Sequence, residues 1–351
     1  MVQKWMIYGA TGYTGQLMVE EAVKKGLKPI VAGRDIKKVT AIADKYHLES
    51  CVFDLNDTKV TNSEVANVDL VLHCAGPFSQ TAKPMMQACL QGQTHYLDIT
   101  GEISVFEDCH ELNQAAKNSG VTLCSGVGFD VIPTDCIAAT LKQELPDAVS
   151  LQLGFDSRSG LSPGTAKTSV EGLKEGGRVR KDGIITKVGF AHGVQKINFG
   201  DGEKLAMTIP WGDVSTAYHS TGIPNIETYI PASPRLVKRM KRLNYVRPLL
   251  GLGFVQNFLK KQIDKKVRGP NKEKRDQLRT YVWGEAVNAD GKKVTARVET
   301  ASGYDLTVYG AVGIVEHFMQ NPVDAGSTTP SQIMGANFVE TLEGSKAITI
   351  D

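Results

Sequence analysis

The segment from Met6 to Gly15, which leads from a short apolar stretch into a helix-forming sequence, constrains the fold of this chain more than any other. Its turn reads Gly9, Ala10, Thr11, Gly12, Tyr13, Thr14 and Gly15. Glycines in such a turn permit a tight bend, let backbone N–H groups approach an anion, and let the next helix pack closely on the strand. The N-terminal N–H groups of that helix would point at the same anion. The pattern predicts a cradle for the pyrophosphate of a dinucleotide. Because its spacing is Gly-x-x-Gly-x-x-Gly, an ordinary strand–turn–helix without a ligand is the alternative.

The end of the second apolar run, Gly33-Arg34, indicates which dinucleotide the chain binds. It follows the glycine turn by roughly twenty residues, where such folds place the group that contacts the adenosine ribose. Asp or Glu there accepts hydrogen bonds from the 2′-hydroxyl of NAD, whereas Arg34 would pair with the 2′-phosphate of NADP. We therefore predict NADP(H) as the cofactor, with a solvated surface charge as the alternative for Arg34. The carboxylate of Asp35 argues against NADP, unless Asp35 serves as the N-cap of the helix over Ile36 to Tyr46.

The composition is that of an ordinary water-soluble protein with room for two hydrophobic cores. The chain has 351 residues, 41% of them hydrophobic, and a net charge of +2, which is too small to indicate nucleic-acid binding. It has no apolar run of about eighteen residues that would span a bilayer, and no signal peptide opens it, so we expect a cytoplasmic protein. Its six cysteines form no Cys-x-x-Cys pair. We therefore expect reduced thiols and no metal site.

Apolar runs that alternate with helix-period segments predict a parallel sheet with helices on both faces over residues 1–125. The runs are Lys4 to Tyr8, Lys28 to Ala32, Ser50 to Phe53, Asp69 to His73, His95 to Ile99 and Val121 to Cys124. This alternation is typical of a doubly wound α/β fold, here a Rossmann dinucleotide-binding domain. Ligands of such sheets bind outside the carboxyl ends of the strands, so the residues that follow each run are candidates for the site.

Three of these strand ends carry chemically suggestive residues. Asp54 is placed either to meet an adenine amino group or to cap the next helix. The turn Ala75-Gly76-Pro77-Phe78 is either a close backbone approach to the nicotinamide half of the cofactor, covered by Phe78, or a plain strand-to-helix turn. Glu102 is either a catalytic acid or an acidic residue at the start of a helix over Ser104 to Lys117.

Short motifs appear in a characteristic order along the chain. They are Gly9-Ala-Thr-Gly-Tyr-Thr-Gly15, Ala32-Gly-Arg34, Ala75-Gly-Pro-Phe78, Tyr96-Leu-Asp-Ile-Thr-Gly-Glu102 and Gly128-Phe-Asp-Val-Ile-Pro-Thr-Asp135, followed by Gly164-Thr165, Trp283-Gly-Glu-Ala286, Gly303-Tyr304, Thr329-Pro330 and Gly335-Ala-Asn-Phe-Val339. As an ordered set they resemble the saccharopine dehydrogenase-like oxidoreductases, the group that includes the trans-acting enoyl reductases. The resemblance implies a Rossmann domain for NADP, followed by an α+β domain with a mixed sheet that holds the substrate and often forms a dimer. It does not imply saccharopine as the substrate, because the chemistry of the group diverges.

The second half is predicted to be an α+β substrate and dimerisation domain over residues 126–328. Strand patterns lie at Val149 to Asp156, Thr280 to Asn288, Lys293 to Thr300 and Tyr304 to Tyr309, with hairpin turns at residues 289–291 and 301–303. Helices are expected over Ala311 to Met319 and over Thr165 to Gly176. Lys167, in the first turn of the latter, either binds an acidic substrate group or is a solvated lysine. Residues 329–351 form a C-terminal segment that, as the resemblance suggests, packs back on the first domain.

The segment from residue 235 to residue 279 differs from the rest of the chain in charge. It holds fifteen basic residues against three acidic ones, and they surround the apolar stretch Leu249 to Leu259. Apolar residues flanked by Lys and Arg are what an interfacial helix offers to anionic lipid, and they would equally line a mouth for an acyl chain. The alternative is a helical excursion whose apolar face packs on its own domain or on a dimer mate. A peripheral membrane contact is therefore a hypothesis for this segment.

The chemistry expected of these parts is hydride transfer. The protein must hold a C=N, C=O or C=C bond against the nicotinamide and supply a proton to it. We predict Glu102 and Asp130 as proton donors, because burial beside an apolar pocket raises carboxylate pKa values, and Tyr96 and Lys167 as substrate contacts. A helix-capping role for Asp130, or catalysis by orientation alone, are the alternatives.

Together these features predict an NADP(H)-dependent reductase of an enoyl or imine substrate, small or lipid-like, that forms a homodimer. A second hypothesis is a sensor or scaffold that holds NADP(H) without turnover. The lack of a Tyr-x-x-x-Lys pair after the fourth strand speaks against a short-chain dehydrogenase mechanism.

Overall fold

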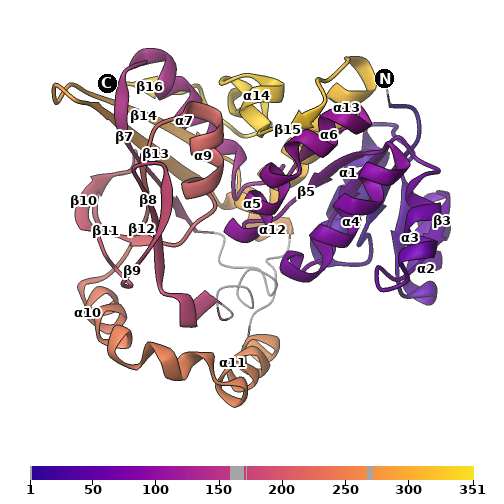
Figure 1. Cartoon of the computed structure of the whole chain (residues 1–351), viewed down its shortest axis with the longest axis horizontal. Coiled ribbons are helices and arrows are strands. Elements are labelled where there is room, and N and C mark those ends of the chain that lie inside the picture. Colours follow the sequence, from indigo (N-terminus) through magenta and orange to yellow (C-terminus); the bar gives the residue numbers. More distant parts are fainter. Residues whose placement is uncertain (1, 159–169, 171, 267–271) are drawn as a thin grey trace. The chain divides into compact units, whose positions relative to one another are not determined.

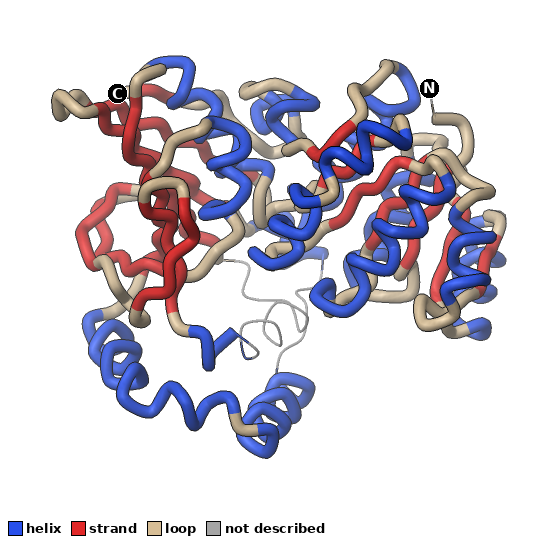
Figure 2. The backbone as a smooth tube through the Cα atoms, in the orientation of Figure 1, coloured by secondary structure: helices blue, strands red, loops and turns tan. Residues whose placement is uncertain are grey.

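The computed structural model describes residues 2–158, 170, 172–266 and 272–351. It consists of two compact units, of which the first comprises Met1–Ile132 and Tyr304–Met334 and the second Pro133–Gly303 and Gly335–Asp351. Each unit has its own sheet and its own helices (Figure 1, Figure 2). The chain therefore leaves the first unit after Ile132, returns to it at Tyr304, and ends in the second.

The first unit is built on a parallel sheet of seven strands. In spatial order they are β15 (Gly326–Ser327), β6 (Thr122–Cys124), β5 (His95–Asp98), β4 (Leu70–His73), β1 (Trp5–Tyr8), β2 (Ile30–Gly33) and β3 (Ser50–Val52). All neighbouring pairs are parallel, and Met6 of β1 lies opposite Ile30 on one side and Val71 on the other. β1 and β4 are buried along their whole length, as strands with helices on both faces are. The predicted doubly wound fold and its six N-terminal strands are confirmed.

Helices alternate with these strands and bury apolar side chains against them. They are α1 (Tyr13–Lys24), α2 (Ile36–Tyr46), α3 (Thr58–Val65), α4 (Phe78–Gly92), α5 (Ile103–Glu111), α6 (Asn113–Ser119), α13 (Gly303–Gln320) and α14 (Pro330–Met334). Met18 of α1 and Met85 and Met86 of α4 are fully buried. The core of this unit thus lies between the sheet and its helices.

The second unit contains a mixed sheet. Its strands follow the order β10 (Val194–Asn198), β11 (Glu203–Ile209), β12 (Asn225–Pro231), β7 (Ala148–Ser157), β13 (Thr280–Asn288), β14 (Lys293–Thr300) and β16 (Thr349–Ile350), while β8 (Gly177–Lys181) pairs with β12 and β9 (Ile184–Val188) with β8. Its helices are α7 (Ile132–Glu144), η1 (Leu173–Glu175), α9 (Asp213–Thr221), α10 (Pro234–Leu243), η2 (Asn244–Gly251), α11 (Gly253–Lys266), α12 (Lys272–Gln277) and α15 (Phe338–Thr341). β7 and β12 are parallel, whereas β13 and β14 form an antiparallel hairpin. The predicted α+β architecture and the strands at 149–156, 280–288 and 293–300 are confirmed.

The strand predicted over Tyr304 to Tyr309 is wrong. These residues form the start of α13, which runs to Gln320 and includes the predicted helix over 311–319. The apolar residues Tyr304, Leu306 and Val308 alternate with polar ones as in a strand. They are buried here on a helix that is buried on most sides, where periodicity no longer separates helix from strand. The predicted hairpin turn at 301–303 is wrong for the same reason, since it leads into this helix.

The predicted division of the second half differs from the structure. Instead of one domain over 126–328, residues 304–334 belong to the first unit because α13 packs there and β15 extends its sheet beside β6. Only residues 329–334 of the predicted C-terminal segment join the first unit. The rest belongs to the second, where β16 pairs with β14.

Lys167 and most of the helix predicted over 165–176 lie outside the described residues. The end of that range is a short 3₁₀ turn, η1. Among the helices that the structure describes, none combines the length and the apolar character needed to cross a bilayer.

Candidate functional site

The glycines of the turn after β1 occupy positions with different steric requirements. Gly9 has a φ of 87°, and a Cβ there would lie 2.7 Å from the backbone nitrogen of Ala75 in the turn after β4. A side chain at Gly15 would collide with the carbonyl oxygen of Gly9, so this glycine lets α1 pack directly on the strand end. At Gly12, by contrast, a Cβ would be in ordinary contact, 3.4 Å from the same oxygen. The chain's own packing therefore requires glycine at positions 9 and 15, whereas it leaves room for a side chain at Gly12.

The same turn offers backbone donors to an anion. Gly12 is the N-cap of α1, so no side chain at that position competes for the N–H groups of the first helical turn. Gly12 and Tyr13 are exposed, and Thr11 and Thr14 are partly exposed, whereas Ala10 is buried. A helix N-terminus with a bare glycine cap suits a pyrophosphate. The residues present thus fit the diphosphate of a dinucleotide.

Arg34 follows β2 at the same sheet edge and is exposed. Within the part of the chain that the structure describes, no carboxylate forms an ion pair with its guanidinium. Asp35 is the N-cap of α2 and accepts a hydrogen bond from the N–H of Lys38 at 3.2 Å. The capping role predicted for Asp35 is confirmed, so this carboxylate is committed to the helix and the argument from Arg34 for a 2′-phosphate stands.

We expect Arg34→Ala to lower the affinity for NADPH about 10- to 100-fold and to change that for NADH by less than about threefold, since a charge-assisted contact to phosphate is lost. Titration followed by nicotinamide fluorescence measures both. Lys28→Ala is the matched control, because this exposed lysine precedes β2 and lies at the opposite sheet edge. An equal loss of NADH and NADPH binding would contradict the assignment.

Asp54 follows β3 and closes a local turn. Its Oδ1 accepts hydrogen bonds from the backbone N–H and the side-chain amide of Asn56, at 2.9 and 2.8 Å. The N-cap of α3 is instead Asp57, which accepts from the N–H of Val60. The capping alternative for Asp54 is therefore wrong, and its contact with adenine stays a prediction.

Glu102 holds the turn Ala75-Gly76-Pro77-Phe78 in place. Its carboxylate accepts hydrogen bonds from the N–H groups of Phe78 at 3.1 Å and Ser79 at 2.9 Å, at the start of α4. Glu102 is also the N-cap residue of α5. A carboxylate at this place stabilises the N-terminus of α4 through hydrogen bonds and the helix dipole. The sequence did not predict this positioning role, and proton donation by Glu102 stays a prediction.

His73, the last residue of β4, is not suited to donate a proton. It is fully buried, and this burial lowers the pKa of its imidazole to about 3. Its Nε2 lies 3.0 Å from the hydroxyl oxygen of Thr81, which donates to the carbonyl of Ala75 at 2.6 Å. The neutral ring therefore supports the turn after β4 instead of titrating near neutral pH.

Asp98 joins the turns after β5 and β6. Its buried carboxylate accepts hydrogen bonds from the Tyr96 hydroxyl at 2.8 Å and from the N–H groups of Thr100 and Gly126 at 2.9 Å each. Burial raises the pKa of Asp98, and these hydrogen bonds oppose the rise. Tyr96 is fully buried and its hydroxyl is committed to Asp98. The structure therefore does not support the predicted substrate contact of Tyr96, which instead orders this carboxylate.

Asp130 lies against the turn that carries Glu102. A Cβ built on Gly101 would lie 2.5 Å from Oδ2 of Asp130, so the carboxyl group covers the bare face of this glycine. Burial raises the pKa of Asp130 to about 7. The turns after β5 and β6 thus bring the two predicted acids together at one edge of the sheet, and one of them can be protonated near neutral pH.

Two residues of α13 complete this edge, and sequence reasoning missed their roles. The hydroxyl oxygen of Thr307 accepts a hydrogen bond from the N–H of Phe129 at 2.9 Å. The ring of Tyr304 packs edge-on against that of Tyr13, with ring centroids 5.2 Å apart. The motif Gly303-Tyr304 was a signal for them, but its assignment to a strand hid the contact.

Among the described residues, no group of three or more His, Cys, Asp or Glu side chains is arranged to hold a metal ion.

Residues 5–124 match the family model described as saccharopine dehydrogenase NADP binding domain. A saccharopine dehydrogenase-like oxidoreductase of Rattus norvegicus is 25% identical over 202 residues, which cover 50% of this chain and 47% of that protein. A trans-acting enoyl reductase of Mycobacterium ulcerans is 28% identical over 138 residues, covering 37% of this chain and 33% of that protein. The chain thus spans about half the length of the rat relative and about a third of the length of the mycobacterial one.

A solved structure supports the fold over the whole length. The apo form of saccharopine dehydrogenase (L-Glu forming) from Saccharomyces cerevisiae superposes with a TM-score of 0.66, covers 99% of both chains, and is 12% identical in sequence. This likeness confirms the fold predicted from the ordered motifs, while the family model matches the N-terminal part of the chain, residues 5–124.

Proposed function

We propose, on the premise that residues 5–124 are a saccharopine dehydrogenase NADP-binding domain, that this chain is an NADP(H)-dependent oxidoreductase that reduces a C=C or C=N bond of an enoyl or imine substrate. The glycine turn would hold the pyrophosphate and Arg34 the 2′-phosphate. When bound, NADPH supplies the hydride. The relative named trans-acting enoyl reductase favours the enoyl class.

One observation carries the proposal. Asp130 lies against Gly101 at the carboxyl edge of the sheet, and burial raises its pKa to about 7. A reduction needs a proton at the atom that does not receive the hydride, and a carboxylic acid with a pKa near the working pH donates one efficiently. Glu102 would keep the turn after β4, and with it Phe78, in position through the N–H groups that it binds. Asp130 is therefore our candidate proton donor, and Glu102 our candidate positioning residue.

The substrate would contact the second unit, whose sheet has no counterpart in a simple nucleotide-binding domain. We also expect a homodimer, as the resemblance implies. We infer the substrate contact and the homodimer from the resemblance of the ordered motifs to the family.

The test is acceptor-dependent loss of NADPH absorbance. The purified chain is offered enoyl thioesters of short and long acyl length and cyclic imines, with the saturated thioesters and amines as matched controls. We expect turnover with one unsaturated class and none with its saturated counterpart. A chain that binds NADP+ and NADPH but oxidises NADPH with none of these acceptors would act as a sensor or scaffold, contrary to the proposal.

A further inference from the structure

The helical stretch from Pro234 to Ile263, here called the basic arm, carries charge of only one sign. It consists of α10, η2 and α11 up to Ile263, which follow one another in the second unit (Figure 1). Its basic residues are Arg235, Lys238, Arg239, Lys241, Arg242, Arg247, Lys260 and Lys261, and it contains no Asp or Glu. Eight like charges in thirty residues are unusual on a protein whose net charge is +2.

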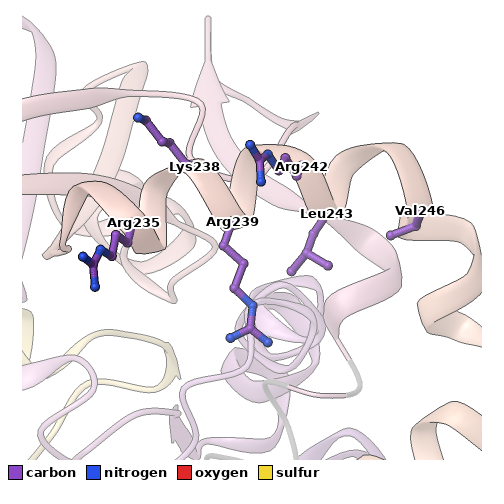
Figure 3. A pocket seen from close by; sticks show the side chains of 6 residues that line it. All are labelled: Arg235, Lys238, Arg239, Arg242, Leu243 and Val246. Atoms are coloured by element: carbon purple, nitrogen blue, oxygen red, sulfur yellow. The ribbon is translucent and has the colours of Figure 1, made fainter.

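The first part of the basic arm separates its apolar and basic faces. Val237 is 7% exposed and packs with Met240 against a cluster that includes Met207 of β11. The opposite side carries exposed basic residues, which line a shallow hollow together with Leu243 and Val246 (Figure 3). Its basic members are Arg235, Lys238, Arg239 and Arg242. In the described part of the chain, none of these four forms an ion pair. For α10, the packing of the apolar face on its own unit is therefore confirmed, and the basic face is left to solvent.

The second part of the basic arm exposes large apolar side chains. Tyr245 is 88% exposed, Leu249 57%, Phe254 74% and Phe258 61%. Phe254 and Phe258 are four residues apart on α11 and so lie on the same side of the helix. Aromatic and leucine side chains exposed to water, in the stretch that follows the exposed basic face of α10, indicate an interaction surface.

We propose that the basic arm docks on the surface of an anionic phospholipid membrane, with Phe254 and Phe258 entering the interface and the basic face of α10 contacting the headgroups. Such a surface offers negative charge and an apolar layer side by side, which matches the two parts of the arm. A second copy of the chain fits less well, because a symmetric contact would place the eight basic residues against their own kind. The proposal does not depend on the reductase activity.

The experiment is co-sedimentation of the full chain with vesicles of phosphatidylcholine, with and without about a third of phosphatidylserine. Wild type should bind the anionic vesicles at least about tenfold more tightly than the neutral ones, and added salt should weaken the binding. Two double variants test the basic and the apolar part of the basic arm separately. R239E/R242E should lose at least about 25-fold in affinity, at about fivefold for each basic charge lost. F254S/F258S should lose about tenfold or more.

Matched controls carry the same changes elsewhere in the second unit. K181E/K292E reverses two exposed lysines, and I184S/I350S replaces two exposed isoleucines. Both controls should bind as wild type does, and circular dichroism melting should show that all four variants fold. Loss of binding in only one test variant, equal binding to neutral vesicles, or equal loss in the controls would overturn the proposal. So would a lower mass of F254S/F258S by light scattering, because the two phenylalanines would then face a second copy.

Discussion

Asp98→Ala is expected to lower the free energy of unfolding of the first unit by about 3–5 kcal/mol. The substitution leaves the hydroxyl of Tyr96 and the N–H groups of Thr100 and Gly126 without their acceptor in the core. A buried donor without a partner costs about 1–3 kcal/mol, and three are created together. The removed carboxylate was itself costly to bury, so the net loss stays below the sum of the three. Urea unfolding followed by circular dichroism measures it.

Two controls separate the effect of burial from the loss of a carboxylate as such. Asp69 also accepts hydrogen bonds from two backbone N–H groups, those of Gln3 and Lys4 at 2.8 and 2.9 Å, but at an exposed position. Asp69→Ala should cost no more than about 1 kcal/mol, because water replaces the acceptor. Tyr96→Phe removes one donor and should cost about 1 kcal/mol as well. Equal losses for Asp98→Ala and Asp69→Ala would show that the Asp98 network does not hold the two turns together.

The sequence predicted the parts of the fold that local pattern controls. Runs such as Leu70–His73 are apolar throughout because helices cover both faces of a parallel strand, so their position could be predicted without knowledge of their neighbours. The φ of 87° at Gly9 and the close contact of Gly15 with the carbonyl oxygen of Gly9 both arise within ten residues of sequence. The strand ends and the residues that follow them were therefore predictable, and with them the edge that carries Arg34, Glu102 and Asp130.

The rest depends on contacts between distant residues, which leave no local pattern. β15 is two residues long and joins the sheet only because it pairs with β6 across about two hundred residues of sequence. Thr307, which accepts a hydrogen bond from the N–H of Phe129, lies on α13, where the buried residues alternate with polar ones as in a strand. Glu102 binds the N–H groups at the start of α4. This contact cannot be predicted from the sequence of α5, the helix that Glu102 itself precedes. Periodicity thus located the edge of the site, but not which of its carboxylates are held in place by hydrogen bonds.

Asp130→Asn is expected to lower kcat/KM of the proposed reduction by about 100- to 10,000-fold, because a general acid is removed from the step that needs a proton. With a pKa raised to about 7 by burial, Asp130 is protonated below this pH and ionised above it. The activity of wild type should therefore fall as the pH rises through about 7, while the remaining activity of Asp130→Asn should not change there. The pH profile of kcat/KM under saturating NADPH measures both.

Stability gives a second readout of the same group. The folded pKa of about 7 lies above the ordinary aspartate value of 3.8, so the folded state holds the proton more tightly than the unfolded chain. The contribution of Asp130 to stability is then fully present below about pH 4 and is lost as the pH rises through about 7. Asp130→Asn lacks this loss, so its unfolding free energy should increase relative to wild type between these pH values. The shift would be seen in urea unfolding at a series of pH values, without substrate.

Glu102→Gln distinguishes the two predicted acids. The amide keeps one acceptor for the N–H groups of Phe78 and Ser79, so the turn after β4 should loosen while Asp130 stays in place. If Asp130 donates the proton, Glu102→Gln lowers activity but keeps the decline near pH 7. If Glu102 is the donor, Asp130→Asn keeps most of the activity and Glu102→Gln loses it. The pH dependence of the unfolding free energy reports on Asp130 in either case. It therefore shows whether the pKa of Asp130 is raised, even if the kinetics identify Glu102 as the proton donor.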